Sequence, residues 1–371
     1  MRSVVVPVSR GVAPQPGITY RQIGVRLWGE GAYEREPVDG SATQYTTLFE
    51  ARSGDIIVNK IWARNGSVAV VEERLSGAFG SGEFPMFAPT GALLPRWAHW
   101  LTKWRPFWEQ CAEKSQGTSG QNRIKPEQFL DIAIPLPSLP EQQRIVAQID
   151  EVAKQLDAAQ TLQATVSAEA DALCRALLRD AHSMATPLRE LVSLRAPDVR
   201  VQADLSYHFA GVYSFGRGVF VGNTKAGTEF AYPKLTRLRT GDFVYPKLMA
   251  WEGAFGIVPP NCDGLVVSTE FPVFEVNRAR VLPEVLDVHF RNAALWASIG
   301  GASTGTNVRR RRLNPRDFLD LVLPLPSMAR QRLLAKACED VQAVKARQSE
   351  SRAMLHALLP AILDRAFSGA L

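Results

Sequence analysis

The side chains of this sequence best suited to chemistry are basic and amide groups of the kind that bind nucleic acid. Lys60 and Lys247 each follow a Gly-Asp turn and one short strand, 187 residues apart. A lysine at such a matched position suits a phosphate contact, which positions a duplex without reading its sequence; the alternative is a solvated strand lysine. The residues around the two lysines differ, and Arg, Asn and Glu can contact guanine, adenine and cytosine edges. The candidate base-reading residues are Asn59, Trp62, Arg64 and Asn65 in the first place and Pro246, Met249, Trp251 and Glu252 in the second, with ordinary strand and loop packing as the alternative, particularly for the tryptophans.

Three further groups could serve the same chemistry. One is a second divergent strip, in which Arg26, Trp28 and Glu30 correspond to Tyr213, Phe215 and Arg217. Another is the basic run "NVRRRRLNP", which holds Arg309, Arg310, Arg311 and Arg312 and corresponds to "SQGTSGQNRIKP", which holds Arg123 and Lys125. Lys225 is a weaker candidate. A basic run is usually a solvated surface, so phosphate or partner contact stands beside that alternative.

No pattern typical of catalysis or metal binding accompanies these residues. There is no G-x-x-x-x-G-K-[ST], and the glycines of "GVYSFGRGVFVG" do not form G-x-G-x-x-G at a strand-to-helix turn. "VPPNC" is not the Asn/Asp-Pro-Pro-aromatic motif of an amino-methyltransferase. The acidic residues form no obvious nuclease cluster, and the five histidines lack metal-ligand spacing. Four scattered cysteines suggest a reducing compartment, without disulfides or a zinc site. The chain is therefore predicted to be non-catalytic and to bind no metal.

Composition fits a soluble protein with two cores. The chain has 371 residues, 46% of them apolar and 22% charged, and a net charge of +6, which fits nucleic acid or an acidic partner but carries little weight alone. No apolar run approaches the roughly 18 residues of a membrane span. The apolar run in the opening "MRSVVVPVSR" is too short for a signal peptide, so a cytoplasmic protein is expected.

The elements that must position these residues occur twice. "SGDIIVNKIWARNGSVAVV" matches "TGDFVYPKLMAWEGAFGIV", and residues 54–87 share 12 identities in 34 positions with 241–274. Later, "PEQFLDIAIPLPS" matches "PRDFLDLVLPLPS". This indicates duplication of a module of about half the chain. Each module begins with short β-rich runs punctuated by Gly and Pro, with 92–114 and 282–299 as its best short helices.

Each module ends in a long helix whose apolar residues recur in steps of four and three, the signature of a helix that packs along another helix. About 38 residues at ~1.5 Å each give a rod of about 57 Å. Gln163 and Gln348 lie near the middle of their seams and could meet if the helices pair antiparallel. The residues predicted to pair are Ile145, Ile149, Val152, Leu156, Gln163, Val166 and Leu173 in the first helix and Val341, Val344, Gln348, Leu355, Leu358 and Ile362 in the second.

This arrangement resembles the specificity (S) subunit of type I restriction–modification enzymes. The resemblance is carried by a globular domain, "IPLPSLPEQQRIV", a long helix, then the whole again, closing on "LLPAILDRAFSGAL". It covers almost the whole chain. Family modules usually open with a short "W…LG" strand; "TPLRELVSL" is an acceptable version and "MRSVVVPVSRG" is not, which leaves a shortened or misplaced N-terminus open.

The resemblance implies an α+β fold. Two β-rich target-recognition domains, 1–138 and 185–327, would be separated by two long antiparallel coiled-coil helices, 139–184 and 328–371. Each domain would read one half of a bipartite double-stranded DNA target, and the helices would set the gap and dock two methyltransferase (M) subunits. Restriction/translocase (R) subunits would cleave DNA, and the partner subunits would use S-adenosylmethionine, ATP and Mg. The alternatives are a coiled-coil protein-binding scaffold that does not recognise DNA, and an S subunit without partners.

Overall fold

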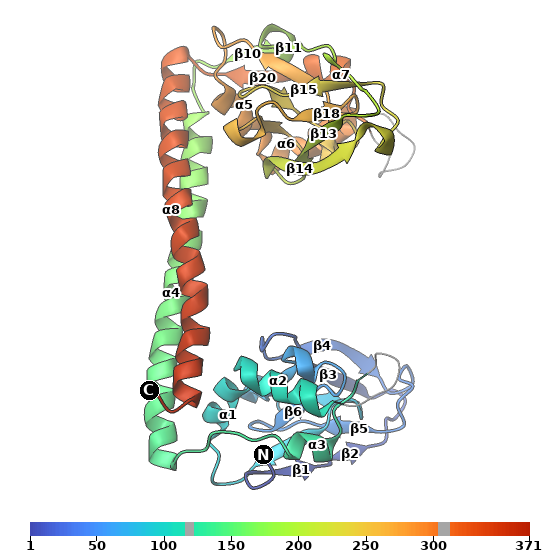
Figure 1. Cartoon of the computed structure of the whole chain (residues 1–371), viewed down its shortest axis with the longest axis vertical. Coiled ribbons are helices and arrows are strands. Elements are labelled where there is room, and N and C mark those ends of the chain that lie inside the picture. The colour runs from blue at the N-terminus through green and yellow to red at the C-terminus, as the bar shows by residue number, and fades with distance from the viewer. Residues whose placement is uncertain (116–121, 303–311) are drawn as a thin grey trace. The chain divides into compact units, whose positions relative to one another are not determined.

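The computed structural model describes residues 1–115, 122–302 and 312–371. The chain divides into two compact units: Met1–Thr161 with Glu350–Leu371 (unit 1), and Leu162–Ser349 (unit 2). Each unit contains one β-rich module and a part of both long helices (Figure 1). The predicted α+β class is therefore confirmed. None of the helices built from the described residues has the length and apolar content needed to cross a membrane.

Unit 1 contains two sheets. The four-stranded sheet has the order β1 (Val5–Val8), β9 (Met86–Pro89), β6 (Ile56–Val58), β7 (Val68–Val70). The five-stranded sheet has the order β2 (Gly11–Val12), β5 (Leu48–Glu50), β8 (Phe79–Gly80), β3 (Thr19–Val25), β4 (Ala32–Asp39), with the β3–β8 pair parallel. The helices of this module are α1 (Pro95–Leu101), α2 (Arg105–Lys114) and α3 (Pro126–Leu130).

Unit 2 repeats this order strand for strand, so the internal repeat seen in the sequence is a repeat of topology. Its four-stranded sheet is β11 (Val192–Leu194), β19 (Val273–Val276), β16 (Phe243–Val244), β17 (Gly256–Ile257). Its five-stranded sheet is β12 (Val199–Arg200), β15 (Lys234–Arg237), β18 (Val266–Ser268), β13 (Ser206–Tyr213), β14 (Gly218–Ala226), with β13–β18 parallel. The remaining elements are α5 (Pro283–Phe290), α6 (Ala293–Ala302), α7 (Pro315–Leu319) and the pair β10 (Met184–Pro187) and β20 (Val322–Leu325).

The first residues of the chain fold like the opening of the second module. β1 pairs antiparallel with β9 as β11 pairs with β19. Arg2 forms an ion pair with Asp131, and at the matching place Arg189 forms one with Asp320. Residues 5–8 thus form the module's opening strand although the letters of "MRSVVVPVSRG" differ from the family pattern, because strand pairing requires backbone groups and apolar side chains rather than a particular motif.

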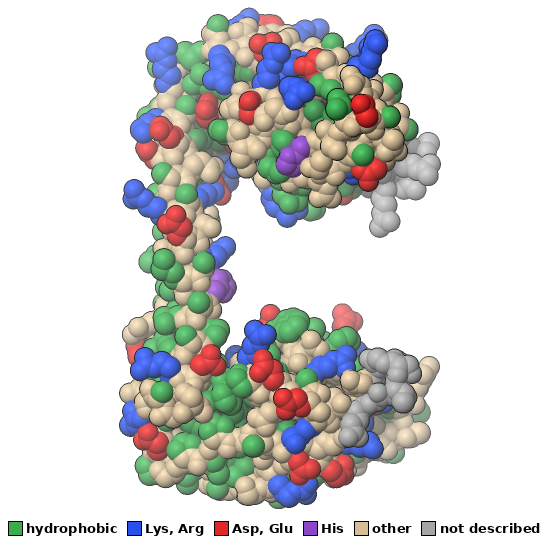
Figure 2. Space-filling view, in the orientation of Figure 1, with side chains coloured by type: hydrophobic (Ala, Val, Ile, Leu, Met, Phe, Trp, Pro, Cys, Tyr) green, Lys and Arg blue, Asp and Glu red, His purple; other side chains and the backbone are tan. Residues whose placement is uncertain are grey.

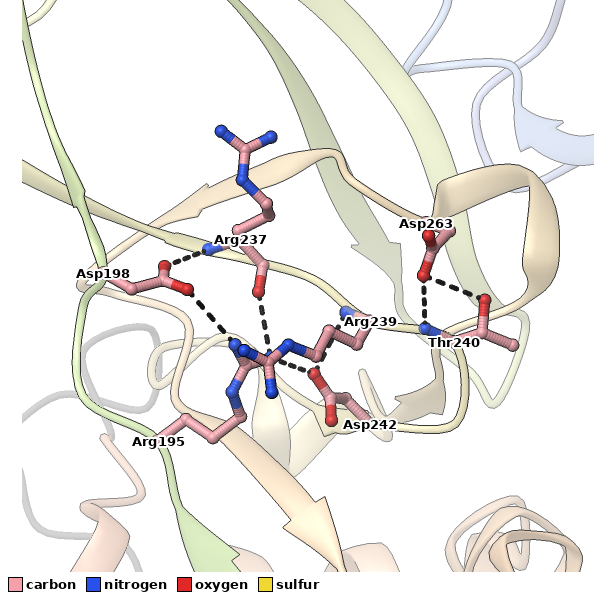
Figure 3. Close-up of polar contacts among 7 residues, drawn as sticks. All are labelled: Arg195, Asp198, Arg237, Arg239, Thr240, Asp242 and Asp263. Carbon is pink, nitrogen blue, oxygen red and sulfur yellow. Dashed lines mark hydrogen bonds and ion pairs between the residues drawn. The ribbon is translucent and has the colours of Figure 1, made fainter.

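At the Gly-Asp turn of unit 2, the buried Asp242 carboxylate belongs to a polar cluster whose other members are half-buried or exposed (Figure 3). The Arg195 guanidinium contacts the Asp242 carboxylate, and its Nη2 lies 3.3 Å from Asp198 Oδ2. The Arg239 backbone N–H donates to Asp242 Oδ2 at 3.1 Å, and that of Arg237 donates to Asp198 Oδ1 at 2.8 Å. Burial raises the pKa of Asp242, against the lowering effect of Arg195. The cluster fixes the turn that begins β16.

The long helices are α4 (Leu139–Leu177) and α8 (Met328–Phe367), which lie side by side (Figure 1). In unit 1, Ile145, Val146 and Ile149 of α4 share a buried cluster with Leu363 and Phe367 of α8. This packing joins the beginning of one helix to the end of the other, as antiparallel helices require.

Unit 2 shows the same antiparallel sense. Asp171 Oδ1 lies 2.7 Å from Lys345 Nζ, and the sulfur atoms of Cys174 and Cys338 are 3.7 Å apart. Along this part of α4 residue numbers rise while their partners on α8 fall. The predicted antiparallel helix pair is therefore observed.

Three residues predicted for the helix seam lie outside it. Leu173, Val344 and Leu358 are exposed, to 53%, 43% and 42%. The buried position next to Leu173 is Cys174, and the half-buried one next to Val344 is Lys345. Residues spaced by alternating steps of four and three rotate around a straight helix by about 20° per heptad. After a few turns, a neighbouring residue therefore faces the partner helix instead. The other predicted positions, which are buried or half-buried, are Ile145, Ile149, Val152, Leu156, Gln163, Val166, Val341, Gln348, Leu355 and Ile362.

Candidate nucleic-acid interface

In unit 1, the candidate residues around Lys60 and the strip around Trp28 meet at one corner of the module. The turn between β3 and β4 docks on the 3-10 turn Ala63–Asn65: the Trp28 backbone N–H donates to Asn65 O at 2.7 Å, and that of Gly29 donates to Gly66 O at 3.1 Å. Gly66 has φ +75°, and a Cβ there would lie 2.6 Å from the Trp108 ring, so both conformation and space require glycine. Residues far apart in sequence therefore form one surface.

The candidate base readers of unit 1 are arranged along this 3-10 turn. Trp62 is 45% exposed, and the Arg64 guanidinium lies 5.7 Å from the centre of its ring. Arg64 Nη1 also donates to Asn122 O at 3.1 Å. Asn59 Oδ1 accepts the backbone N–H of Ile61 at 3.1 Å, so this amide oxygen holds the turn and is not free to contact a base.

Unit 2 builds the same corner with other side chains. The Phe215 backbone N–H donates to Glu252 O at 2.8 Å, and that of Gly216 donates to Gly253 O at 2.9 Å. Met249, in the place of Trp62, is 38% exposed. Trp251 is half-buried, and its indole nitrogen has no hydrogen-bond partner among the described residues. The backbone frame is shared by the two modules, and the side chains on it differ.

Each of the two matched lysines lies beside a glutamate that occupies the same position in both modules. Lys60 Nζ is 3.7 Å from Glu83 Oε1, and Lys247 Nζ is 3.9 Å from Glu270 Oε1. The backbone N–H of each lysine donates to the carbonyl of the same glutamate, at 3.1 and 3.0 Å. The lysines are thus held in place from two sides, and phosphate contact remains a prediction for them.

Each glutamate also holds one arginine from the predicted basic segments. Arg123 Nη1 lies 3.2 Å from Glu83 Oε1, and Arg312 contacts the carboxylate of Glu270. Each group of lysine, arginine and glutamate keeps one net positive charge. In the sequence, both glutamates open an identical "EFP" at the same position of the repeat. Their contact with the lysines depends on strand pairing, which the sequence pattern does not give.

Arg26 and Arg217 lie two residues along the chain from Trp28 and Phe215, whereas the other remaining candidates are scattered. The guanidinium groups of Arg26 and Arg217 lie 4.7 Å over Tyr33 and 4.6 Å over Tyr213. Lys125 is exposed beside α3. Lys225 is exposed near the end of β14, whereas Phe215 lies in the turn before the strand begins. At ~3.3 Å per strand residue, Lys225 is about 23 Å from the start of β14. Arg309, Arg310 and Arg311 lie outside the described residues.

The described residues offer binding groups and no metal centre. No cluster of three His, Cys, Asp or Glu among them could hold a metal ion. Burial lowers the pKa of His99 and of His289 to about 4, so both rings are neutral at pH 7. Burial also raises the pKa of the Cys111 thiol to about 12. These side chains pack within their modules.

Comparison with known proteins identifies this architecture. Residues 33–168 match the family model described as the type I restriction modification DNA specificity domain. The predicted family resemblance is confirmed. The matched specificity domain contains the 3-10 turn, Lys60 and Glu83. None of the curated proteins is a significant match.

Solved structures share the fold over the full length. The HsdS subunit from Thermoanaerobacter tengcongensis is 20% identical, with a TM-score of 0.51 over 100% of this chain and 96% of that one. A structure described as showing complex assembly and conformational transition of the type I R-M system is 18% identical, with a TM-score of 0.61 over 99% and 98%. The type I restriction-modification system S subunit from M. genitalium is 11% identical, with a TM-score of 0.51 over 99% and 94%.

Proposed function

We propose that this chain is the non-catalytic DNA sequence-specificity subunit of a type I restriction–modification complex, and that it binds a bipartite double-stranded DNA target. The observation that carries the proposal is that the same corner, with different exposed side chains, is built in both modules, one of which overlaps a DNA specificity domain. A shared frame with variable side chains suits two readers of two half-sites.

The helix pair suits the second task, which is docking of methyltransferase subunits. Apolar side chains remain exposed on both helices although the helices pair with each other (Figure 2). Such side chains favour packing by further helices or a partner surface. The apolar side chains of the two helices with at least half of their surface exposed are Leu162, Leu173, Leu333 and Met354.

In this function, the chemistry resides in the partners. Two methyltransferase subunits would supply S-adenosylmethionine-dependent methylation, and restriction subunits would supply ATP- and Mg-dependent translocation and cleavage. This chain would contribute recognition and spacing, since each long helix of 39 or 40 residues is stiff enough to hold a fixed gap between two half-sites.

Methylome sequencing of cells with the chain intact and deleted tests the proposal. The intact strain should show one two-part methylated motif that disappears on deletion and returns when the gene is supplied again. As a matched control, re-expression of the chain without residues 139–371 should not restore it. An unchanged methylome after deletion, with no sequence preference of the purified chain for duplex DNA, would indicate a protein-binding scaffold instead.

A further inference from the structure

Two aromatic residues adopt a backbone conformation that such residues rarely adopt. Trp28 has φ +60° and Phe215 has φ +64°, and they are the only non-glycine residues with positive φ in the described parts of the chain. The left-handed region is unfavourable for bulky side chains and open to glycine. Both modules nevertheless place an aromatic at this same position of the repeat, which indicates that the ring itself is needed there.

Backbone contacts fix the conformation, so it cannot relax. In each module the strained residue and the glycine after it donate their N–H groups to a 3-10 turn and the glycine that ends it, at 2.7 and 3.1 Å for Trp28 and Gly29 and at 2.8 and 2.9 Å for Phe215 and Gly216. The turn is therefore a rigid platform for one side chain.

The two rings are directed to solvent. Trp28 is 60% exposed and Phe215 is 63% exposed, each above the exposure of Trp62 or Met249 nearby. Each ring lies against a tryptophan on one side: ring centres are 6.4 Å apart for Trp28 and Trp108 and 6.2 Å apart for Phe215 and Trp296. A supported, strained and exposed aromatic is typical of a residue that contacts a partner.

The surroundings of the rings favour DNA as that partner. An exposed arginine lies two residues from each ring, Arg26 in unit 1 and Arg217 in unit 2, and both guanidinium groups stack on tyrosines. Aromatic rings beside cations fit bases beside phosphates. The two rings differ in kind, Trp and Phe, as contacts to two different half-sites would.

We propose that Trp28 and Phe215 are the residues with which each module makes an apolar contact to the bases of its own half of the DNA target. This rests on the proposed function, and it assigns specificity to two side chains on the β-hairpin turns. The Lys–Arg–Glu group of each module would then contact the DNA backbone.

Glycine substitution separates recognition from folding, because glycine adopts positive φ without strain. The full-length chain and its Trp28→Gly and Phe215→Gly variants are incubated with a pool of random-sequence duplex DNA, and bound sequences are selected and sequenced. We expect Trp28→Gly to lose enrichment of one half of the two-part sequence by about tenfold, the scale of one good base contact, and to keep the other half. Phe215→Gly should show the reverse, and neither should lower the melting temperature.

Tyr45→Gly is the matched control, because Tyr45 is an aromatic of the same module that is 52% exposed; it should leave both halves enriched. If Trp28→Gly and Phe215→Gly still select both halves as the wild type does, the proposal is overturned. A lower melting temperature with unchanged selection by the folded fraction also overturns it and assigns the rings to packing. A wild-type chain that enriches no sequence overturns the proposed function and this proposal with it, so the two failures differ.

Discussion

Lys60 and Lys247 take part in the scaffold of their modules and, in the proposed function, would also contact DNA phosphates. The lysine side chains are 24% and 22% exposed, and each ammonium group lies near a glutamate that an arginine also contacts. An ion pair of this exposure contributes at most about 1 kcal/mol to folding. The positive charge left over in each group is available to a phosphate.

Replacing these lysines with methionine tests the phosphate contact. We expect Lys60→Met and Lys247→Met each to weaken duplex binding about equally for all sequences, and to reduce the slope of log affinity against log salt by about 1, since one phosphate contact releases about one counterion. Binding titrations at several salt concentrations measure this. Lys154→Met, at an exposed position on α4, is the control and should leave the slope unchanged. A lower melting temperature with an unchanged slope would assign the lysines to the scaffold alone.

Sequence comparison aligned the candidate residues of the two modules and missed their conformations. It placed Trp28 opposite Phe215 and Lys60 opposite Lys247. It could not show a positive φ, because non-glycine residues in that region carry no sequence signature, nor that Asn59 holds its own turn. Both depend on backbone geometry that a repeat alignment does not contain.

Among the elements, the helices were the easiest to predict and their seams the hardest to place. Residues 139–177 form one helix; the predicted spacer 139–184 extends further, and its last residue begins β10. The seam, however, follows contact with the partner helix: at Lys345 the ammonium pairs with Asp171, which places Val344 outside the contact. Periodicity alone favours the apolar valine over the neighbouring lysine, and for that reason the prediction of Val344 was wrong.

Two valines of α8 that lie three residues apart, close to one turn of helix, test this seam. Val341 is half-buried and packs against the core of unit 2, whereas Val344 is 43% exposed. We expect Val341→Ala to lower the free energy of unfolding by about 1 kcal/mol, since buried methyl groups are lost, and Val344→Ala to change it by less than about 0.5 kcal/mol. Urea denaturation of the full chain measures both. Equal losses for the two variants would restore the seam predicted from the sequence.

For the whole molecule, duplication explains why so much of the fold follows from sequence comparison. Strand order is the same in both modules, so one alignment predicts both sheets. Sequence comparison fails where the two copies form an equivalent interaction with residues at different positions of the repeat. Asp55 and Asp242 are aligned, but Asp55 pairs with Arg10 and Asp242 with Arg195, and these arginines are 45 and 47 residues away. Such a shift of two residues along the chain is invisible to position-by-position comparison, although the ion pair it makes is equivalent.

Separate cores make the first module exchangeable in principle. The clusters of unit 1 involve only residues of its module and of the helix parts beside it, as do those of unit 2. In unit 1 the module also packs on helix ends: Trp104 Nε1 donates to Asp364 Oδ1 at 2.8 Å, and the ring of Trp97 lies 4.9 Å from that of Phe367. An exchanged module must retain these two contacts.

We therefore expect a chain in which residues 1–138 come from another specificity subunit, chosen to keep tryptophans at these two positions, to change one half of the methylated motif. The other half and the gap should stay the same, because residues 139–371 still carry the second reader and both long helices. Methylome sequencing reads all three parts of the motif at once. A graft that lacks the two tryptophans is the control for the contacts between the module and α8. It should be less stable, because those contacts are lost. A graft that alters both halves, or the gap between them, would show that the modules do not read independently.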